Sequence, residues 1–401
     1  MNNSITLEQA QLMLQSLLPP RQVEEVSLAK AYKRVLAKDV FAVDNLPIGY
    51  QSAVDGYALG DGNVLQYSLF KLKGYLRLDE VSKYSLKSGE AVGVLTGGLL
   101  PPGCKAVVNH EKVVVDGINL KVLEEVKRGQ NIRIKGEDYK QGELILPTGQ
   151  ALDPGAIGLL AAFGVGKITV FKQPRVSVLS LGDNVVPWHQ TPVQGQIRDS
   201  NSQMLKVLIE QDGGLVKDIF IVASSSIEEQ CTIIQDMLEQ NDILICTGRS
   251  YLADGFDTQQ VFAAVGGKII FCNIPIQPGS HTVAAHHRNT FLFSLSGNPA
   301  ACFVNYQLFV APVIRAMQGK KAVLQKLNAR CTNSYLKQIT TRRLVRGHAE
   351  YTPRGWEVSV LPGQKPSMLK SLVQCNALID LPAGHPPVEV NMQVPVILLY
   401  A

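Results

Sequence analysis

Clustered cysteines, long apolar runs and blocks of like charge are all missing from this sequence of 401 residues. Its seven cysteines are an odd number, lie far apart and form no Cys-x-x-Cys pair, which argues against a zinc site or a redox motif. We expect reduced and mostly buried thiols without a catalytic role. The cysteines are Cys104, Cys231, Cys246, Cys272, Cys302, Cys331 and Cys375.

The chain also lacks the usual signs of export, membrane insertion and nucleic-acid binding. Its apolar runs stay below the roughly 18 to 20 residues that a membrane-spanning helix needs, and residues 1–7 show no basic region leading into an apolar one. The 39 basic and 34 acidic residues are spread along the chain, so the net charge of +5 forms no basic patch. We therefore expect a cytoplasmic protein with no membrane span and no nucleic-acid partner.

What the chain does contain is enough apolar sequence for several cores. A chain of 401 residues is longer than one hydrophobic core usually serves, so two to four domains are expected. With 46% hydrophobic residues, each domain can have a core of its own. Thr6 with Gln9 resembles a capping box, and apolar residues at helical spacing run to Pro19-Pro20. A second short helix is predicted over 28–37. No repeat of 20 to 50 residues is visible.

Short Val, Leu and Ile runs separated by Gly, Pro and Asp predict a small β-rich domain from about Val40 to Lys127. Its strands are expected near 93–95, 106–108 and 113–115. The chain then returns to a helix, with Asp153 as the N-cap, Pro154 in the first turn and Gly164 at the end.

Strands and helices alternate between Arg175 and Lys320, which predicts a parallel sheet with helices on both faces. The last eighty residues are β-like again and predict a final small domain. The expected strands are 176–181, 216–222, 243–246, 268–271, 290–295, 358–361, 377–381 and 394–399, and the expected helices are 202–211, 227–240, 258–265 and a long apolar helix after Asn298.

Ligands of such sheets bind beyond the carboxyl ends of the strands, where loops converge and helix N-termini attract anions. Four loops of the α/β region have suitable sequences, and a phosphorylated or nucleotide-like molecule is the simplest ligand that they share. The loops are Ser180 to Asn184, Gly195 to Asn201, Cys246 to Asp257 and Ser296 to Pro299.

Each loop also has a purely structural interpretation. Asp183 could lie in an ordinary turn, and Asp199 or Ser200 could serve only as a helix N-cap. Asp254 and Asp257 could share Mg²⁺, which proteins hold with one or two carboxylates plus ligand phosphates. Asp257 could instead only cap the helix that follows it.

Two polar segments near glycines lie outside the α/β region. They are Ser52 to Ala58, which reads Ser-Ala-Val-Asp-Gly-Tyr-Ala, and Arg133 with Gly136-Glu137-Asp138. Structural turns would explain either segment taken alone.

The order of these segments resembles the molybdopterin molybdenumtransferases, the family of MoeA and of the gephyrin E domain, nearly end to end. The most specific match is Pro47 followed by Ser52 to Ala58, which is similar to the family signature Ser-Ala-Met-Asp-Gly-Tyr-Ala. Further matches are Thr96-Gly97, Pro102-Gly103, Glu111, Arg133, Gly136-Glu137-Asp138, Gly182-Asp183, Arg198-Asp199-Ser200-Asn201, Asp254, Asp257 and Gly297-Asn298-Pro299.

The resemblance implies a multidomain fold of α/β and β parts. A doubly wound α/β domain, similar to those that adenylate molybdopterin, is expected at 173–320. A discontinuous helical linker domain is expected at 1–43 plus 128–172, with a β-rich domain inserted at 44–127, and a C-terminal β domain at 321–401.

The activity implied by the resemblance is the Mg²⁺-dependent insertion of molybdate into adenylated molybdopterin, with release of AMP. Breaking a phosphoanhydride and seating an oxyanion calls for metal-held carboxylates and cationic donors. The implied partners are a second copy of the chain in a homodimer, the molybdopterin-adenylating protein, and molybdoenzymes or their chaperones.

The resemblance also implies roles for individual residues. Asp199, Asp254 and Asp257 are expected to hold Mg²⁺ or orient the anhydride, and Asp55 and Asp138, from this or the other subunit, to complete the catalytic cleft. The remaining residues are expected to bind the substrate and are Ser52, Thr96, Gly97, Glu111, Asp183, Ser200, Asn201, Gly248, Gly297, Asn298, Pro299 and Arg346.

Several family positions are replaced in this chain. Gln277-Pro278-Gly279-Ser280 stands where the family has Lys-Pro-Gly-Lys, and 248–253 lacks two glycines of the family's Gly-Gly-x-Ser-x-Gly loop. Asn184 replaces a glutamate and Gln51 an asparagine. Arg249, His281 and His286 could restore the lost charge, or they could be solvated loop residues.

Three functions remain open at this point: an active insertase, a non-catalytic family member that binds a pterin or a protein partner, and an enzyme for another nucleotide-linked substrate. Convergence of Asp55, Asp199 and Asp257 with Arg249 in the cleft would favour the first. Tyr251 and Leu252 filling the cleft would favour the second, and a deep pocket for another base or acyl group would favour the third.

Overall fold

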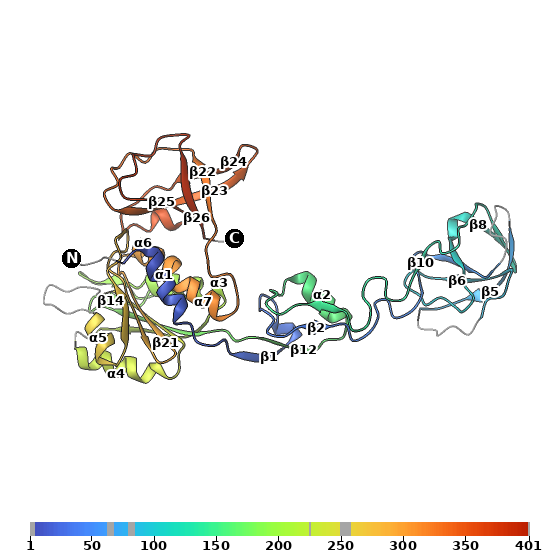
Figure 1. The fold of residues 1–401 in the computed structure, drawn as a ribbon, viewed down its shortest axis with the longest axis horizontal. Coiled ribbons are helices and arrows are strands. Elements are labelled where there is room, and N and C mark those ends of the chain that lie inside the picture. Colours follow the sequence, from blue (N-terminus) through green and yellow to red (C-terminus); the bar gives the residue numbers. More distant parts are fainter. Residues whose placement is uncertain (1–4, 62–67, 79–84, 224–225, 249–257, 400–401) are drawn as a thin grey trace. The chain divides into compact units, whose positions relative to one another are not determined.

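The computed structural model describes residues 5–61, 68–78, 85–223, 226–248 and 258–399. The chain divides into two compact units, one formed by Met1–Ala37 with Ile168–Ala401 and the other by Lys38–Lys167 (Figure 1).

The α/β part of the larger unit is built on a six-stranded sheet in the order β16-β13-β17-β21-β20-β18. The first four strands run parallel, as predicted, but β20 and β18 are antiparallel to their neighbours, so the sheet is mixed rather than parallel. A tight turn between β20 and β21, with Arg288 in the left-handed region, causes the reversal. The strands are β13 (Arg175–Leu181), β16 (Leu215–Val222), β17 (Ile243–Gly248), β18 (Lys268–Cys272), β20 (Val283–His287) and β21 (Thr290–Leu295).

Helices cover both faces of this sheet, as predicted. One apolar core joins alternate side chains of β13, β17 and β21 to α1 (Leu7–Ser16), α3 (Asn201–Asp212) and the long helix after Asn298. The other core joins the opposite face to α4 (Ile227–Leu238) and α5 (Thr258–Ala264) (Figure 1).

The long helix consists of α6 (Pro299–Asn305), a π-helical turn (Tyr306–Val310) and α7 (Ala311–Met317). It is long and apolar enough to cross a bilayer, contrary to the expectation that no segment of the chain would be. Since 94% of its most apolar window is buried, its hydrophobicity is explained by its place in the α/β core.

The N-terminal helix shows the predicted capping box, in which the backbone N–H of Gln9 donates to Thr6 Oγ1 at 3.2 Å and the backbone N–H of Thr6 donates to Gln9 Oε1 at 2.9 Å. It packs in the α/β core, although residues 1–43 were assigned to the linker domain. The helix predicted over 28–37 is wrong. Only a 3₁₀ turn (Leu28–Lys30) forms, because Lys33 adopts a left-handed conformation that an α-helix cannot contain.

The C-terminal part is a six-stranded sheet in the order β19-β23-β24-β22-β26-β25, with β23 also paired to β25. Its first strand, β19 (Ile276–Gln277), belongs to the α/β region and pairs in parallel with the start of β23 (Arg342–Thr352). The loop after β19 is therefore fixed to both parts of this unit. The other strands are β22 (Lys326–Cys331), β24 (Gly355–Val360), β25 (Ala377–Leu381) and β26 (Gln393–Leu398), and a 3₁₀ turn lies at Lys370–Leu372.

The smaller unit contains the predicted β-rich domain as a sheet in the order β7-β4-β6-β5-β9-β8, and the predicted helix α2 (Pro154–Ala162) capped by Asp153. Its strands are β4 (Gly56–Leu59), β5 (Leu69–Tyr75), β6 (Glu90–Val94), β7 (Ala106–Asn109), β8 (Val113–Asp116) and β9 (Asn119–Val122). Two-stranded ladders join β2 (Val40–Phe41) to β11 (Leu144–Leu146) and β3 (Gln51–Ser52) to β10 (Ile132–Arg133). In the larger unit, β1 (Val23–Ser27) pairs with β12 (Lys167–Phe171), and β14 (Val185–Val186) with β15 (Ile197–Arg198).

Helix α3 is held at its C-terminal end by a buried carboxylate. Asp212, the last residue of the helix, accepts hydrogen bonds from Arg315 Nε at 2.6 Å and from the Tyr306 hydroxyl at 2.8 Å. Burial raises the pKa of Asp212, and the opposing charge of Arg315 favours its ionised form. This ion pair fixes α3 to the long helix and so helps to position the residues at the other end of α3.

Replacing Arg315 by leucine should remove the ion-pair partner of the buried Asp212, leave Lys320 as the only nearby cation among the described residues, and lower the free energy of unfolding by up to about 3–5 kcal/mol. The loss should shrink as the pH falls, because protonation of Asp212 removes the unpaired charge. Urea denaturation at several pH values checks this. The double variant Asp212→Asn with Arg315→Leu should recover part of the loss, and a fully additive loss would contradict the pairing.

Candidate functional site

The candidate site of the larger unit lies at the edge where β13, β17 and β21 have their carboxyl ends. Strand β20 runs in the opposite direction, and its first residue Val283 lies opposite Ser294 of β21. The loop 277–282 that leads into β20 therefore reaches the same edge as the loops that follow Leu181 and Leu295.

Asp199 is buried at this edge, directly before α3. Its carboxylate accepts hydrogen bonds from Ser180 Oγ at 2.7 Å and from the backbone N–H of Ser202 at 3.0 Å. The second bond caps α3, while Ser200 at the cap position makes no side-chain cap hydrogen bond. Asp199 thus has a structural role, and its two oxygens keep further acceptor capacity.

Asn201 joins three of the predicted loops. Its side-chain N–H₂ donates to Thr247 Oγ1 at 3.0 Å and to the carbonyl of Gly297 at 2.9 Å. Its Oδ1 is buried and has no hydrogen-bond partner among the described residues. An orphaned buried oxygen of this kind is a natural contact for a ligand donor or a cation.

Gly248 and Gly297 bring the ends of β17 and β21 into close contact. A Cβ on Gly248, whose φ is +104°, would lie 2.1 Å from the carbonyl oxygen of Leu181. A Cβ on Gly297 would lie 3.0 Å from the Cα of Gly248. Packing of the loops therefore requires glycine at both positions, whether or not a ligand approaches them.

Part of the predicted site lies outside the described residues. Asp254 and Asp257, two of the three expected Mg²⁺ ligands, belong to this part, as do Arg249, Tyr251 and Leu252. The described residues contain no group of three or more His, Cys, Asp or Glu side chains that could hold a metal ion. The Mg²⁺ site therefore stays a prediction.

Asp183 and Asn298 are exposed at this edge, and Pro299 begins α6. The N-terminus of α6 is less free for an anion than the sequence suggested, since the backbone N–H of Ala300 donates to the carbonyl of Pro366 at 3.0 Å. Proline itself has no N–H to offer.

Arg346 lies in a pocket of about 350 Å³ between the loop 277–280 and the C-terminal sheet. Its side chain is buried and donates only to neutral acceptors: Ser371 Oγ at 3.1 Å and the carbonyls of Gly363 and Lys365, both at 3.3 Å. No described carboxylate forms an ion pair with it. Burial lowers the pKa of Arg346 to about 10, which leaves the guanidinium charged at neutral pH.

The two histidines considered as replacement cations differ in position. His281 is exposed beside the loop 277–280, and its Nδ1 lies 3.2 Å from Asn273 Oδ1. His286 lies opposite Phe291, where β21 begins, and hence at the edge of the sheet away from the site. Burial lowers the pKa of His286, so this ring holds a positive charge less readily than a free histidine.

The structure brings four of the predicted residues of the smaller unit together, because β4 and β6 pair next to them. The Asp55 carboxylate accepts from the backbone N–H of Thr96 at 2.7 Å and from its hydroxyl at 3.0 Å. Ser52 is buried and bonds within its own turn, donating to Val54 O at 2.6 Å, and its carbonyl accepts from the N–H of Gly97. The Thr96 N–H, followed by the Thr96 hydroxyl, lowers the pKa of Asp55.

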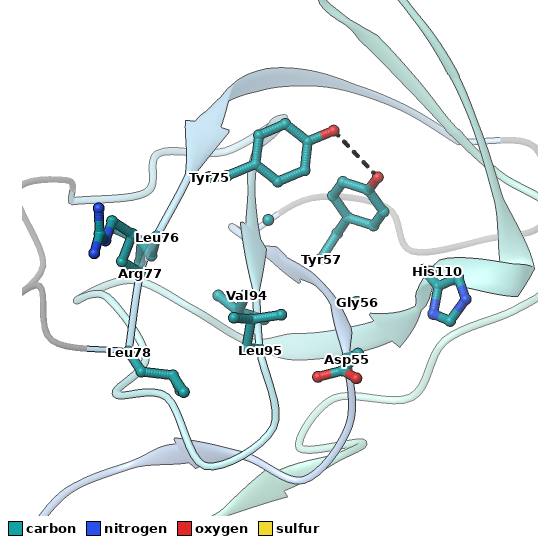
Figure 2. Close-up of a pocket in the computed structure, with 11 residues that line it drawn as sticks. Asp55, Gly56, Tyr57, Tyr75, Leu76, Arg77, Leu78, Val94, Leu95 and His110 are labelled. Carbon is teal, nitrogen blue, oxygen red and sulfur yellow. Dashed lines mark hydrogen bonds between the residues drawn. The ribbon is translucent and has the colours of Figure 1, made fainter.

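Asp55 lines a pocket of about 650 Å³ in the same unit, together with residues that the sequence did not single out. Figure 2 shows Asp55 at one end and the rings of Tyr57 and Tyr75 at the other, with their hydroxyl oxygens 3.4 Å apart. His110 and Arg77 add polar groups to a mostly apolar lining. Glu111 and Asp138, both exposed, are not among the described residues that line it.

Sequence patterns also missed most of the Arg346 pocket. Arg343, Tyr335 and Gln364 line it beside Arg346, and Ser371 holds the Arg346 guanidinium. The pair Arg342-Arg343 was a visible signal, but nothing local indicates that its two side chains have different surroundings.

Comparison with protein families matches nearly the whole chain. Residues 5–164 match the MoeA N-terminal region (domain I and II), residues 177–316 a probable molybdopterin binding domain, and residues 328–399 the MoeA C-terminal region (domain IV).

Individual relatives agree with this result. A molybdopterin molybdenumtransferase of Staphylococcus aureus (strain Mu50) is 30% identical over 379 residues, which cover 93% of this chain and 90% of that protein. One from Staphylococcus epidermidis is 28% identical over the same length, with the same coverage of both chains. The crystal structure of the molybdopterin biosynthesis MoeA protein from Pyrococcus horikoshii is similar over 100% of both chains, with a TM-score of 0.83 and 25% identity.

Substituting Thr96 by valine removes the hydroxyl donor to Asp55 and keeps the N–H donor. The pKa of Asp55 should rise in the variant but stay below the ordinary value of about 3.9, because the N–H is the larger cause. Stability from this contact is present above the unfolded-state pKa and is lost as the pH falls through the folded-state pKa.

Carbon-13 NMR titration of the carboxyl groups measures this shift. Asp39 is an internal control, because Thr148 lowers its pKa in the same way elsewhere in this unit. An unchanged Asp55 pKa would show that the hydroxyl contact does not affect its ionisation.

Proposed function

We propose that this chain, which belongs to the MoeA family, inserts molybdate into adenylated molybdopterin and releases AMP. The observation that carries this proposal is the buried guanidinium of Arg346, which no described carboxylate neutralises. A buried cation without an anion is costly, and an oxyanion in the pocket beside it would remove that cost.

The size of the pocket is consistent with an oxyanion and part of a second substrate. At about 350 Å³ it is far larger than the roughly 10–15 Å³ that a single buried water needs. Molybdate is a dianion with four acceptor oxygens and suits a guanidinium and hydroxyls as donors. Ser280, which lines the pocket, and Ser371, bound to Arg346, offer such hydroxyls.

Asp199 and Asn201 are proposed to bind the adenylated substrate with Mg²⁺. Two lines of observation support the fit: the Asp199 carboxylate has acceptor capacity left, and Asn201 Oδ1 is buried without a described partner. Oxygen ligands of this kind suit Mg²⁺, which would offset the negative charge of the phosphates as the anhydride breaks. Asp254 and Asp257 are proposed to complete the ligand set.

In this mechanism Arg346 holds the oxyanion, and Asp199 and Asn201 orient the phosphoanhydride. Because the donors and acceptors are fixed by the strand ends and by α3, little reorganisation is needed when charge develops. Asp55, with its lowered pKa, remains a carboxylate at neutral pH. We propose that Asp55, Asp138 and Thr96, from this or the other subunit, also take part in binding this substrate.

The proposal includes a cytoplasmic homodimer that takes its substrate from a molybdopterin-adenylating protein and passes its product to molybdoenzymes or their chaperones. Apolar side chains on the smaller unit support the dimer. Phe41 and Leu144 lie opposite each other in the β2–β11 ladder and are 51% and 44% exposed. Ile48 and Tyr50 are also exposed, and apolar groups left in solvent in this way favour a protein interface.

The direct test is AMP release by the purified protein with adenylated molybdopterin, Mg²⁺ and micromolar molybdate. Asp199→Asn is the matched variant, because the amide oxygen can still accept from Ser202 and its N–H₂ can donate to Ser180. We expect the variant to keep its thermal midpoint within a few degrees and to lose about 100-fold or more in rate.

Chelation of Mg²⁺ should stop the reaction, and added Mg²⁺ should restore it. The absence of AMP release by folded wild-type protein would refute the insertase function. Equal rates for the wild type and Asp199→Asn would refute the role of Asp199.

Replacing Phe41 by aspartate should convert the protein to a monomer, because the interface would then have to bury a charge. Sedimentation velocity measures this change, with Ile118→Asp, an exposed position in the turn between β8 and β9, as the control. A monomeric wild type, or an unchanged Phe41 variant, would contradict the proposed interface.

A further inference from the structure

We propose that Arg343 is a second oxyanion-binding residue of the Arg346 pocket and supplies the positive charge that the loop 277–280 lacks. This inference rests on the proposed function, since it names a further residue for the same site.

The position of Arg343 follows from one strand pairing. Gln277 of β19 and Arg343 of β23 are register partners, and both line the pocket. One terminal nitrogen of the guanidinium donates to Gln277 Oε1, and the other donates to the Tyr335 hydroxyl at 3.3 Å. Its Nε is buried and has no hydrogen-bond partner among the described residues. Both terminal nitrogens of the guanidinium are therefore held in place, while the buried Nε–H remains an unpaired donor within the described part of the chain.

The other arginines in the described part of the chain show that a partly buried arginine without an ion pair is unusual here. Apart from Arg343 and Arg346, each described arginine that is not exposed forms an ion pair with a carboxylate. These pairs are Arg34 with Glu24, Arg133 with Glu137, Arg175 with Asp242, Arg315 with Asp212, Arg330 with Glu357 and Arg342 with Asp380.

The two exceptions share one pocket. Arg343 and Arg346 are the only charged side chains among the described residues that line it. Burial is the main cause of the lowered pKa of Arg346, and the positive charge of Arg343 contributes to it. The two guanidinium groups repel each other and have no described carboxylate between them, so an anion in the pocket would stabilise both charges.

The chemistry of the two groups indicates the class of ligand. A guanidinium presents its N–H donors in a planar fork that matches pairs of oxygens on a tetrahedral anion. Gln277 contributes an amide oxygen that orients Arg343 without neutralising it. A glutamate at this position would form an ion pair with Arg343 and cancel the charge that the oxyanion needs.

Molybdate binding by isothermal titration calorimetry tests the inference, in full-length protein without the pterin substrate. Arg343→Gln should weaken binding about tenfold or more, the range expected for loss of a charged hydrogen bond. Gln277→Glu should weaken it to a similar degree while keeping Arg343 in place. Arg354→Gln, an exposed arginine in the turn between β23 and β24, removes the same charge outside the pocket and should bind molybdate like the wild type.

Thermal unfolding separates a binding effect from misfolding. Arg343→Gln is the decisive variant, because it removes the guanidinium without adding a charge, whereas the carboxylate of Gln277→Glu would itself repel an anion in the pocket. Wild-type affinity in both Arg343→Gln and Gln277→Glu would overturn the inference.

The outcome is distinguishable from that of the proposed function. Molybdate binding that depends on Arg343, without AMP release, would support the inference and refute the insertase. AMP release with unaltered molybdate affinity in both variants would support the insertase function and refute the inference.

Discussion

The charge of Arg346, buried among neutral acceptors, is the constraint on which the rest of the site depends. A hydroxyl and two carbonyls satisfy part of its hydrogen-bonding capacity, but they leave the positive charge without an opposite partner. The backbone of Arg346 is fixed by the side-chain amide of Gln364. This amide accepts a hydrogen bond from the Arg346 N–H and donates one to the Arg346 carbonyl. Such a group is more easily explained as a binding site for an anion than as a stabilising element.

Contacts between residues far apart in the sequence place the loop 277–280 next to Arg346. Strand β19 follows β18 in the chain but pairs with β23, which attaches the loop 277–280 to the C-terminal sheet. On the other side, Asn305 of α6 donates to the carbonyl of Gly279 at 2.8 Å and holds the same loop. A Cβ on Gly279 would lie 2.4 Å from that amide nitrogen, so glycine allows the two to meet. The loop is thus a bridge between the helical layer and the C-terminal sheet.

Local patterns were sufficient for most of the elements but not for their pairing. The capping box at Thr6, the Asp153 cap and the alternation in 175–320 predicted helices and strands that the structure contains. The reversed direction of β20 was not predictable, because an apolar sequence does not show in which direction its strand runs in the sheet. The helix expected at 28–37 failed at Lys33, whose left-handed backbone has no signature in a lysine.

Local sequence patterns also named individual residues of the site without showing which of them lie together. Asp199, Asn201 and Arg346 could be named from motif matches, and the structure shows which hydrogen bonds each of them makes. Arg343 could not be named, because its surroundings depend on a strand partner 66 positions away in the sequence. Asp55 and Thr96 were named separately, and only the pairing of β4 with β6 shows that they form one hydrogen-bonded unit.

The central claim is that an oxyanion binds between the two arginines of this pocket. Anomalous diffraction from crystals soaked in tungstate, a heavier oxyanion of the same shape and charge, would locate it directly. The account predicts an anomalous peak in the pocket, within hydrogen-bond distance of both the Arg346 and the Arg343 guanidinium groups. A peak elsewhere with the pocket empty, or contacts to neither arginine, would contradict it.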